Sequence, residues 1–122
     1  MSAVEKINLA DKLSQFDEHW SPRIVAELNG QHVKLAKVKG EFEWHHHEDE
    51  DELFHVLKGR LTIEFRDRSV ELGPGECLVV PRGVEHRPVA EQETHILMFE
   101  PASTLNTGNV RSERTVEDPE RL

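Results

Sequence analysis

Histidine and acidic side chains are concentrated in one short stretch of the sequence, EWHHHEDEDELFHVLKG, residues 43–59. This window holds four of the chain's eight histidines and six acidic residues. Imidazole nitrogens and carboxylate oxygens bind divalent transition metals, so the window is a candidate metal site. A purification tag does not explain it, because tags stand at chain ends and this run is internal. The competing interpretation is a solvated acidic loop. The spacing of the histidine and acidic residues along the chain distinguishes a metal site from such a loop.

The elements that must position these side chains are short β-strands. Strands are expected in RIVAEL, QHVKLAKV, FEWHH, ELFHVL, RLTIEF, SVEL, ECLVV, EHRPV and HILMFE. Turn residues separate these runs, and Asn29-Gly30 is a strong hairpin signal because both residues tolerate positive φ. Gly40 is expected to be another such turn. Many short strands with Gly and Pro turns are typical of an all-β sandwich or barrel.

Two flanking segments differ from this β-rich region. Residues 1–22 carry a loose apolar stripe that predicts a short helix ahead of Pro22. Residues 101–122 are polar and predict a tail that lies over the barrel or frays. The expected organisation is therefore an N-terminal lead-in over 1–22, a barrel over 23–100 and a C-terminal tail over 101–122.

Length, charge and cysteine content limit the classes of function. A chain of 122 residues fits one domain with its own core. The net charge of −9 argues against nucleic acid and anionic membranes as partners. We find no secretion signal and no apolar run that could cross a bilayer, and the single Cys77 cannot form an internal disulfide. A cytoplasmic location is expected, with Cys77 buried in its apolar strand.

Alternation along a strand sorts the candidate ligands by face. His45 and His47 point to the same side, about 7 Å apart at the Cα atoms, whereas His46 points to the other side. Two imidazoles at this distance can converge on one ion. A strand that opens at Glu52 brings its carboxylate to them. His86 is the candidate for the fourth ligand, because it follows a Pro-Arg-Gly turn.

Weaker candidates remain open. Asp51 replaces Glu52 if the turn shifts by one residue, and the acids 48–51 are otherwise interpreted as a solvated turn. His46 is expected at the surface or in an interface, and His55 is expected to be structural because it alternates away from Glu52. The histidines without a spacing signal are His19, His32 and His95.

These two segments resemble the two signature motifs of the cupin superfamily, across residues 40–90. The first motif reads here as Gly40, His45, His47, Glu52 and Gly59, with four residues instead of five between Gly40 and His45. The second reads as Gly75, Pro81, Gly83 and His86, with Ala90 where the family often has Asn. The resemblance is closest to small single-domain cupins, some of which are loosely labelled as resembling phosphomannose isomerase.

The resemblance implies an all-β jelly-roll (double-stranded β-helix) barrel, here with a short N-terminal helix and a polar C-terminal tail. It also implies one divalent ion held by His45, His47, Glu52 and His86, and such mixed ligation suits Fe, Mn, Ni, Co or Zn. The expected function is a metal-dependent enzyme acting on a small organic acid, sugar or related metabolite, as a dioxygenase, isomerase or decarboxylase. The alternative is a non-catalytic module that binds a small molecule.

A second catalytic group is not identified by the sequence. The chain has no tyrosine that could serve as an acid or a radical. The remaining polar candidates for the cavity are Lys34, Arg60, Arg87, His95 and Glu100.

The strands on either side of the acidic turn are apolar on both faces, so both faces must be covered. A homodimer that buries Trp44 and Leu53, or their strand neighbours, near its two-fold axis is expected. The alternative is a monomer whose N-terminal segment covers the outer face.

Overall fold

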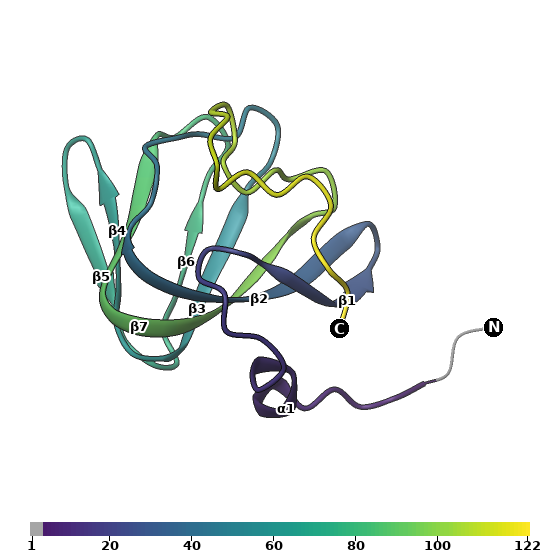
Figure 1. Ribbon diagram of the computed structural model, residues 1–122. Coiled ribbons are helices and arrows are strands. Elements are labelled where there is room, and N and C mark those ends of the chain that lie inside the picture. Colours follow the sequence, from purple (N-terminus) through teal and green to yellow (C-terminus); the bar gives the residue numbers. More distant parts are fainter. Residues whose placement is uncertain (1–3) are drawn as a thin grey trace.

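The computed structural model describes residues 4–122, in which one short helix precedes seven strands (Figure 1). The elements are α1 (Leu9–Leu13), β1 (Arg23–Leu28), β2 (Gln31–Glu41), β3 (Glu52–Lys58), β4 (Leu61–Phe65), β5 (Ser69–Leu72), β6 (Cys77–Val80) and β7 (His86–Pro101). All pairings between these strands are antiparallel. The predicted all-β barrel with a short N-terminal helix is confirmed.

Strand β7 joins the two sides of the barrel. The strand order is β1-β2-β7-β3-β6, and β4 pairs with both β5 and β7. The first residues of β7 pair with β4, where Phe65 lies opposite His86. Its residues from His95 to Phe99 pair with β3, and β2 pairs with β7 from Val89 to Pro101. Figure 1 shows β7 curving along the base of the barrel beside β2. One continuous strand therefore carries side chains to both ends of the interior.

Alternation along β7 and β3 selects the side chains that face inward. On β7 the even-numbered residues from His86 to Glu100 are buried, apart from Gln92 in an exposed stretch. On β3 the buried residues are Glu52, Phe54 and Val56. Glu52 thus opens its strand on the inward face, as the sequence predicted. Polar groups from both strands share the interior with the main apolar core.

The expectations for the turns were partly wrong. Asn29 and Gly30 form the predicted hairpin turn with positive φ of 50° and 77°. Gly40, expected to be a turn, lies within β2 at φ 86°, where the pairing with β7 shifts register after Val38. A glycine that adopts positive φ accommodates such a β-bulge. Because β2 ends soon after it, the expected strand over residues 42–46 does not form.

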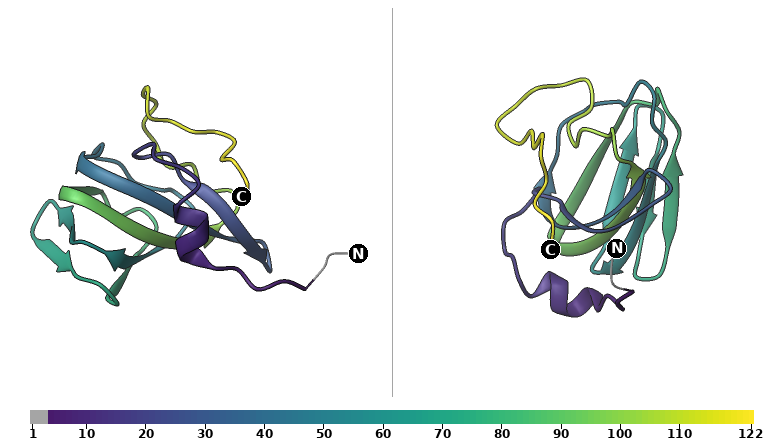
Figure 2. Two further views of the ribbon diagram at one scale, coloured as in Figure 1. Left: turned by 60° about the horizontal axis from the view of Figure 1, so that its bottom comes forward. Right: turned by 90° about the vertical axis from the view of Figure 1, so that its right-hand side faces the viewer.

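The N-terminal segment covers part of the outer face of the sheet. Leu13 and Phe16 pack with Val25 and Leu35 in a second apolar cluster, and Figure 2 shows α1 against the outer side of the strands. Its partly buried neighbours are Leu9, Val33, Leu57, Leu97 and Leu122. Trp20, in contrast, stacks on Phe42 at 4.7 Å between ring centroids, beside the main core.

The C-terminal segment lies over the barrel and returns to β1, as Figure 2 shows. Ile24 forms a bridge with Arg121, and its carbonyl accepts a hydrogen bond from the Leu122 amide at 3.0 Å. The strands span Arg23 to Pro101. The division of the chain into lead-in, barrel and tail stays a prediction, although the strand limits agree with it.

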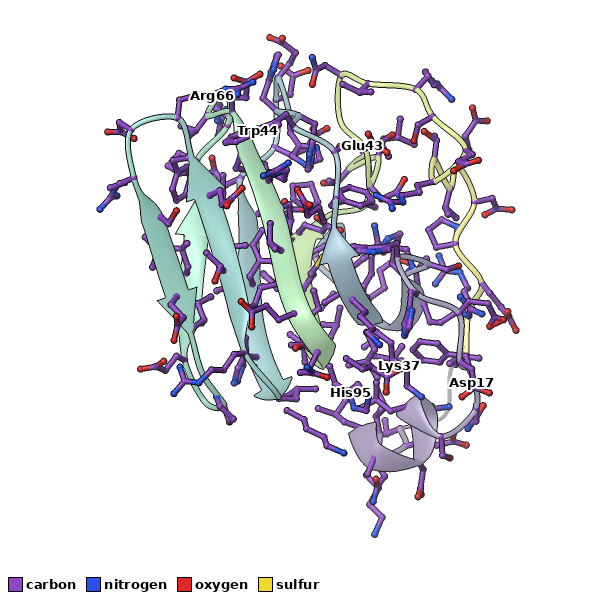
Figure 3. All side chains as sticks on the ribbon, turned by 60° about the vertical axis from the view of Figure 1, so that its left-hand side comes forward. Asp17, Lys37, Glu43, Trp44, Arg66 and His95 are labelled. Carbon is purple, nitrogen blue, oxygen red and sulfur yellow. The ribbon has the colours of Figure 1, made fainter. Side chains whose placement is uncertain are left out.

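Polar and aromatic contacts cover both ends of the barrel. Figure 3 shows Lys37 and Asp17 beside α1, and Trp44 and Arg66 at the opposite end. The Arg66 guanidinium lies 3.8 Å from the centroid of the Trp44 ring.

Cys77 is exposed, so the expectation that it fills the core was wrong. No helix among residues 4–122 is long and apolar enough to span a membrane.

Candidate metal centre

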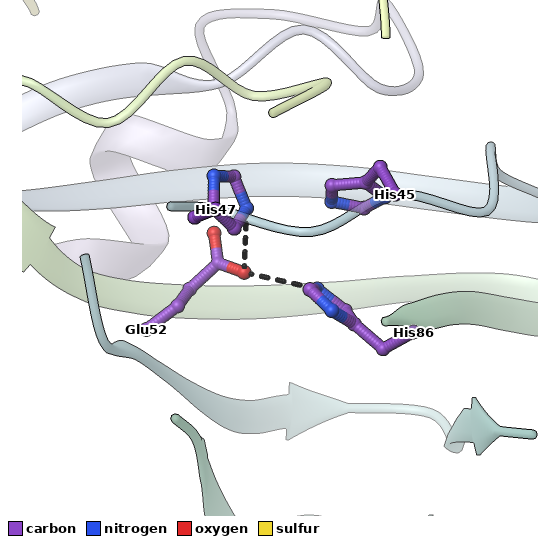
Figure 4. A group of neighbouring side chains, drawn as sticks. All are labelled: His45, His47, Glu52 and His86. Atoms are coloured by element: carbon purple, nitrogen blue, oxygen red, sulfur yellow. Dashed lines mark ion pairs between the residues drawn. The ribbon is translucent and has the colours of Figure 1, made fainter. Parts of the chain in front are cut away.

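Four side chains from three parts of the chain converge inside the barrel (Figure 4). His45 and His47 lie on the segment between β2 and β3, Glu52 opens β3, and His86 opens β7. Each offers one ligand atom, and these atoms all lie within 4.8 Å of one another. All four side chains are buried. The structure thus brings together the four residues that the motif spacing singled out.

The spacing of the ligand atoms fits an ion between them. The Nε2 atoms of His47 and His86 each lie 3.4 Å from Oε1 of Glu52. Two ligand atoms that share an ion at about 2.1 Å are roughly 3.0–3.4 Å apart for bond angles from 90° to tetrahedral. The same three atoms are buried without a hydrogen-bond partner. Buried polar atoms are ordinarily paired, so the cluster has the character of a ligand set.

Hydrogen bonds on the far side of two imidazoles fix their orientation. His45 Nδ1 lies 2.8 Å from the carbonyl oxygen of Glu43, and His86 Nδ1 lies 2.9 Å from that of Val84. A carbonyl oxygen can only accept, so each Nδ1 carries the proton. This tautomer leaves the Nε2 lone pair free, as a metal ligand requires.

Backbone hydrogen bonds hold the segment that carries His45 and His47. His45 and His86 exchange two amide–carbonyl bonds of 3.0 and 2.9 Å. The Gly83 amide, in the turn before β7, donates to the His47 carbonyl at 2.7 Å. The turn that the sequence assigned to presenting His86 therefore also holds the neighbouring ligand segment.

The charge states of two candidate ligands suit metal binding at neutral pH. Burial, assisted by the neighbouring His86, lowers the pKa of His45 to about 4. Burial alone would raise the pKa of Glu52, but the imidazoles of His47 and His86 outweigh it and hold that pKa well below its usual range. Metal ligands must be deprotonated, and both groups already are.

A second polar pair lies against Glu52. Lys34 Nζ is 3.0 Å from Oε1 of Glu100, and both side chains are only 2% exposed. Burial and the negative charge of Glu52 raise the pKa of Glu100 well above its usual range, so this carboxyl keeps its proton to higher pH. The Glu100 carboxyl also lies within hydrogen-bonding reach of Glu52, and its other oxygen, Oε2, is buried without any further partner.

A small cavity of about 40 Å³ adjoins these groups. Its polar lining comes from His45, Glu52, Glu100 and Asn106. Its apolar walls are Trp20, Pro22, Ala36, Val38, Phe42, Phe54, Pro88, Ile96 and Met98. A water needs roughly 10–15 Å³ of such space, so a few waters or one small group fit beside the ligand atoms.

The other sequence candidates lie outside this cluster. The Asp51 carboxylate accepts a hydrogen bond from the Arg82 amide at the surface, and the His46 ring contacts Glu48 at 2.5 Å. His95 contacts Glu93, also away from the cluster. Arg60 pairs with Glu71, and Arg87 pairs with Glu41 and Glu64.

Two features of the site were not identified, or were left open, when the site was predicted from the sequence. Lys34 and Glu100 were named only among five candidates, because their pairing depends on the register between β2 and β7. Asn106 carries no motif at all, and it reaches the cavity only because the C-terminal segment folds back over the barrel.

Comparisons with known proteins agree with this architecture. The solved structure of a cupin-2 domain containing protein from Shewanella frigidimarina is 53% identical, with a TM-score of 0.77, and the match covers 78% of this chain and 93% of that one. The uncharacterized protein YdbB of Bacillus subtilis is 45% identical over 64 residues, which are 52% of this chain and 57% of that protein. The acireductone dioxygenase of Yarrowia lipolytica is 28% identical over 99 residues, 76% of this chain and 57% of that enzyme. The matches to these two curated relatives thus span 57% of each relative's length.

A family match completes the comparison. Residues 31–100 match the family described as Cupin domain. The matched range is more than half of the chain and contains all four clustered side chains, which confirms the resemblance found in the two motifs. The chain therefore belongs to the cupin domain family.

Proposed function

We propose that this protein is a metal-dependent enzyme of the dioxygenase type that acts on a small organic molecule. The observation that carries the proposal is the convergence of three imidazoles and one carboxylate, with unpaired buried ligand atoms, beside an apolar cavity. A set of four protein ligands leaves room for substrate at an ion that accepts five or six.

The dioxygenase type is supported by a relative. The match to the acireductone dioxygenase of Yarrowia lipolytica extends over 76% of this chain at 28% identity. When bound, a redox-active ion such as Fe(II) would supply the electron transfer that lets an organic substrate react with dioxygen. In a reaction of this type both oxygen atoms would enter the substrate, so no further reductant would be needed.

The residues of the chain have separate roles in this proposal. His45, His47, Glu52 and His86 would hold the ion. Glu100 contacts the substrate through Oε2, while Lys34 holds the other oxygen of the same carboxyl. The apolar walls exclude bulk water from the reacting atoms, which strengthens every polar contact there.

The lining of the cavity narrows the substrate class. Each buried hydroxyl of a sugar needs a hydrogen-bond partner, and leaving one unpaired costs about 1–3 kcal/mol. Only four of the lining residues are polar, and two of these belong to the ligand set. A small organic acid or related metabolite with an oxygen for the ion and a compact apolar remainder fits this lining better than a polyol.

Oxygen uptake tests the proposal. Protein freed of metal is reconstituted separately with Fe(II), Mn, Ni, Co or Zn and assayed against a panel of small organic acids, keto acids and sugars. We expect oxygen consumption with one metal and one substrate group, and none with Glu100→Leu. Metal-dependent turnover without oxygen uptake would contradict the dioxygenase proposal and indicate an isomerase or a decarboxylase. Metal-dependent ligand binding without turnover would favour the binding module.

A further inference from the structure

The segment that carries two of the four ligands has little support from the sheet. His45, His46 and His47 lie between β2 and β3, outside both strands. On one side they are held by the bridge to His86 and by the bond from Gly83. Their side-chain positions therefore depend on what holds the other side.

One residue of the C-terminal segment occupies that other side. The His46 amide donates to Oδ1 of Asn109 at 2.8 Å. The Asn109 amide donates back to the His46 carbonyl at 3.0 Å. A single residue thus pairs both backbone groups of His46, as a neighbouring strand would. Because His46 stands between the two ligands, fixing its peptide groups fixes the directions in which His45 and His47 project.

The neighbouring residue makes the contact close. Gly108 adopts φ +56°, and a Cβ atom there would clash with the His46 carbonyl and lie 3.0 Å from Cδ2 of the His45 ring. The clash is with backbone, which cannot move aside cheaply. Only glycine allows the C-terminal segment to lie this close to the ligand segment.

The C-terminal segment is itself well anchored. Thr107 is fully buried, and its hydroxyl lies 2.7 Å from that of Thr115. Asn106 donates to the Arg114 carbonyl at 2.8 Å and accepts from the Val116 amide at 2.9 Å. A segment with this internal bonding can transmit a fixed position to the residues it touches.

We propose that Gly108 and Asn109 form a clamp on the His45–His47 segment and that Asn109 is a positioning residue of the metal site. The inference rests on the metal site of the proposed function but not on the reaction. The C-terminal segment is then part of the site, since it sets two of the four ligands before any ion binds.

Cobalt(II) titration of the metal-free protein tests the clamp. Asn109→Ala removes the acceptor for the His46 amide, whereas Asn109→Asp keeps an oxygen in the same place. Loss of a group that orients ligands typically costs 10–100-fold in metal affinity. We expect a loss of that size and a changed visible spectrum of bound cobalt for Asn109→Ala, with near-wild-type affinity and spectrum for Asn109→Asp. Ser103→Ala is the matched control, because Ser103 Oγ in the same C-terminal segment donates to Glu50, which is not a candidate ligand, and not to the His45–His47 backbone.

Three results separate the possible failures. Equal cobalt affinity and an unchanged spectrum in Asn109→Ala would overturn the clamp alone. A wild-type protein that binds no cobalt would overturn the metal site on which both proposals rest. Amide hydrogen exchange of His46 in the metal-free wild type needs no variant. We expect this amide to be protected, and fast exchange would contradict the clamp even if Asn109→Ala fails to fold.

Discussion

Single side chains decide the chemistry of this barrel, because several of its buried polar side chains converge at one point. Nε2 of His47, Nε2 of His86 and Oε1 of Glu52 are buried and unpaired within one small volume. An unpaired buried polar group costs about 1–3 kcal/mol. Retaining three of them at one point is understandable if an ion compensates for the cost.

The low pKa of His45 predicts a pH dependence of stability in the metal-free protein. The pKa of an unfolded histidine is about 6.5, and that of folded His45 is about 4, so the unfolded state binds the proton more readily between these values. The contribution of His45 is complete above pH 6.5 and is lost as the pH falls towards 4, by about 3 kcal/mol in all. Urea unfolding with a chelator present, at pH 7 and pH 4.5, measures it. His45→Gln should show a clearly smaller difference, and an identical difference would contradict the assignment.

The Lys34–Glu100 pair predicts a cost for removing the lysine. Lys34→Met leaves Oε1 of Glu100 buried without a partner, which should lower the free energy of unfolding by about 1–3 kcal/mol. Lys39→Met is the matched control on the same strand, because Lys39 is exposed and its loss should change stability by less than about 0.5 kcal/mol. Denaturant unfolding of both variants measures these losses of stability. Equal unfolding midpoints for Lys34→Met and Lys39→Met would mean that the buried pair contributes nothing.

At the scale of elements, strand alternation was the most reliable guide. It placed Glu52, Phe54 and Val56 on one inward face of β3, as the structure has them. His45 and His47 also come together as expected, but they do so on a segment between strands, where alternation does not explain it. The alternation could be read because β-strand side chains repeat every two residues regardless of tertiary context.

Local patterns failed where tertiary contacts decide. Gly40 has the composition of a turn but serves as a bulge, because β2 continues along β7. Cys77 has apolar neighbours but stands on the exposed side of a short strand. The partner of Asn109 could not be predicted, since 63 residues separate it from His46 and no repeating pattern links them.

Glycine positions give a prediction at this scale. Gly59 adopts φ +94°, and a Cβ atom there would lie 2.5 Å from Oγ1 of Thr94, which is itself fixed by hydrogen bonds to Arg60. Gly30 adopts φ +77° with open space around it. Gly30→Ala should cost about 1 kcal/mol from backbone strain alone, and Gly59→Ala at least about 1 kcal/mol more. Thermal unfolding compares them, and equal losses would show that the contact with Thr94 is easily relieved.

At the scale of the whole molecule, the chain itself covers only part of the outer face of the sheet. The N-terminal segment covers Leu57 and Leu97. Leu53 pairs with Val79 on the neighbouring strand, and Val79 is 52% exposed. The Trp44 ring is covered by the guanidinium of Arg66 from the same chain. A dimer interface would therefore centre on Leu53 more than on Trp44.

The homodimer therefore stays a prediction with a narrower location. Light scattering at micromolar concentration should give about twice the chain mass of 14.1 kDa. Val79→Asp introduces a charge on the exposed strand and should shift the mass towards the monomer. A wild-type mass near that of one chain would mean that the N-terminal segment is the only cover this face needs.

The most direct test of the account is the metal content of the protein and its ligand variants. Elemental analysis of wild-type protein should find one divalent ion per chain. His47→Ala and His86→Ala should lose it while keeping a β-rich circular dichroism spectrum. His46→Ala, whose ring lies outside the cluster beside Glu48, should retain it. One full equivalent of metal in both His47→Ala and His86→Ala would contradict the assignment of the site.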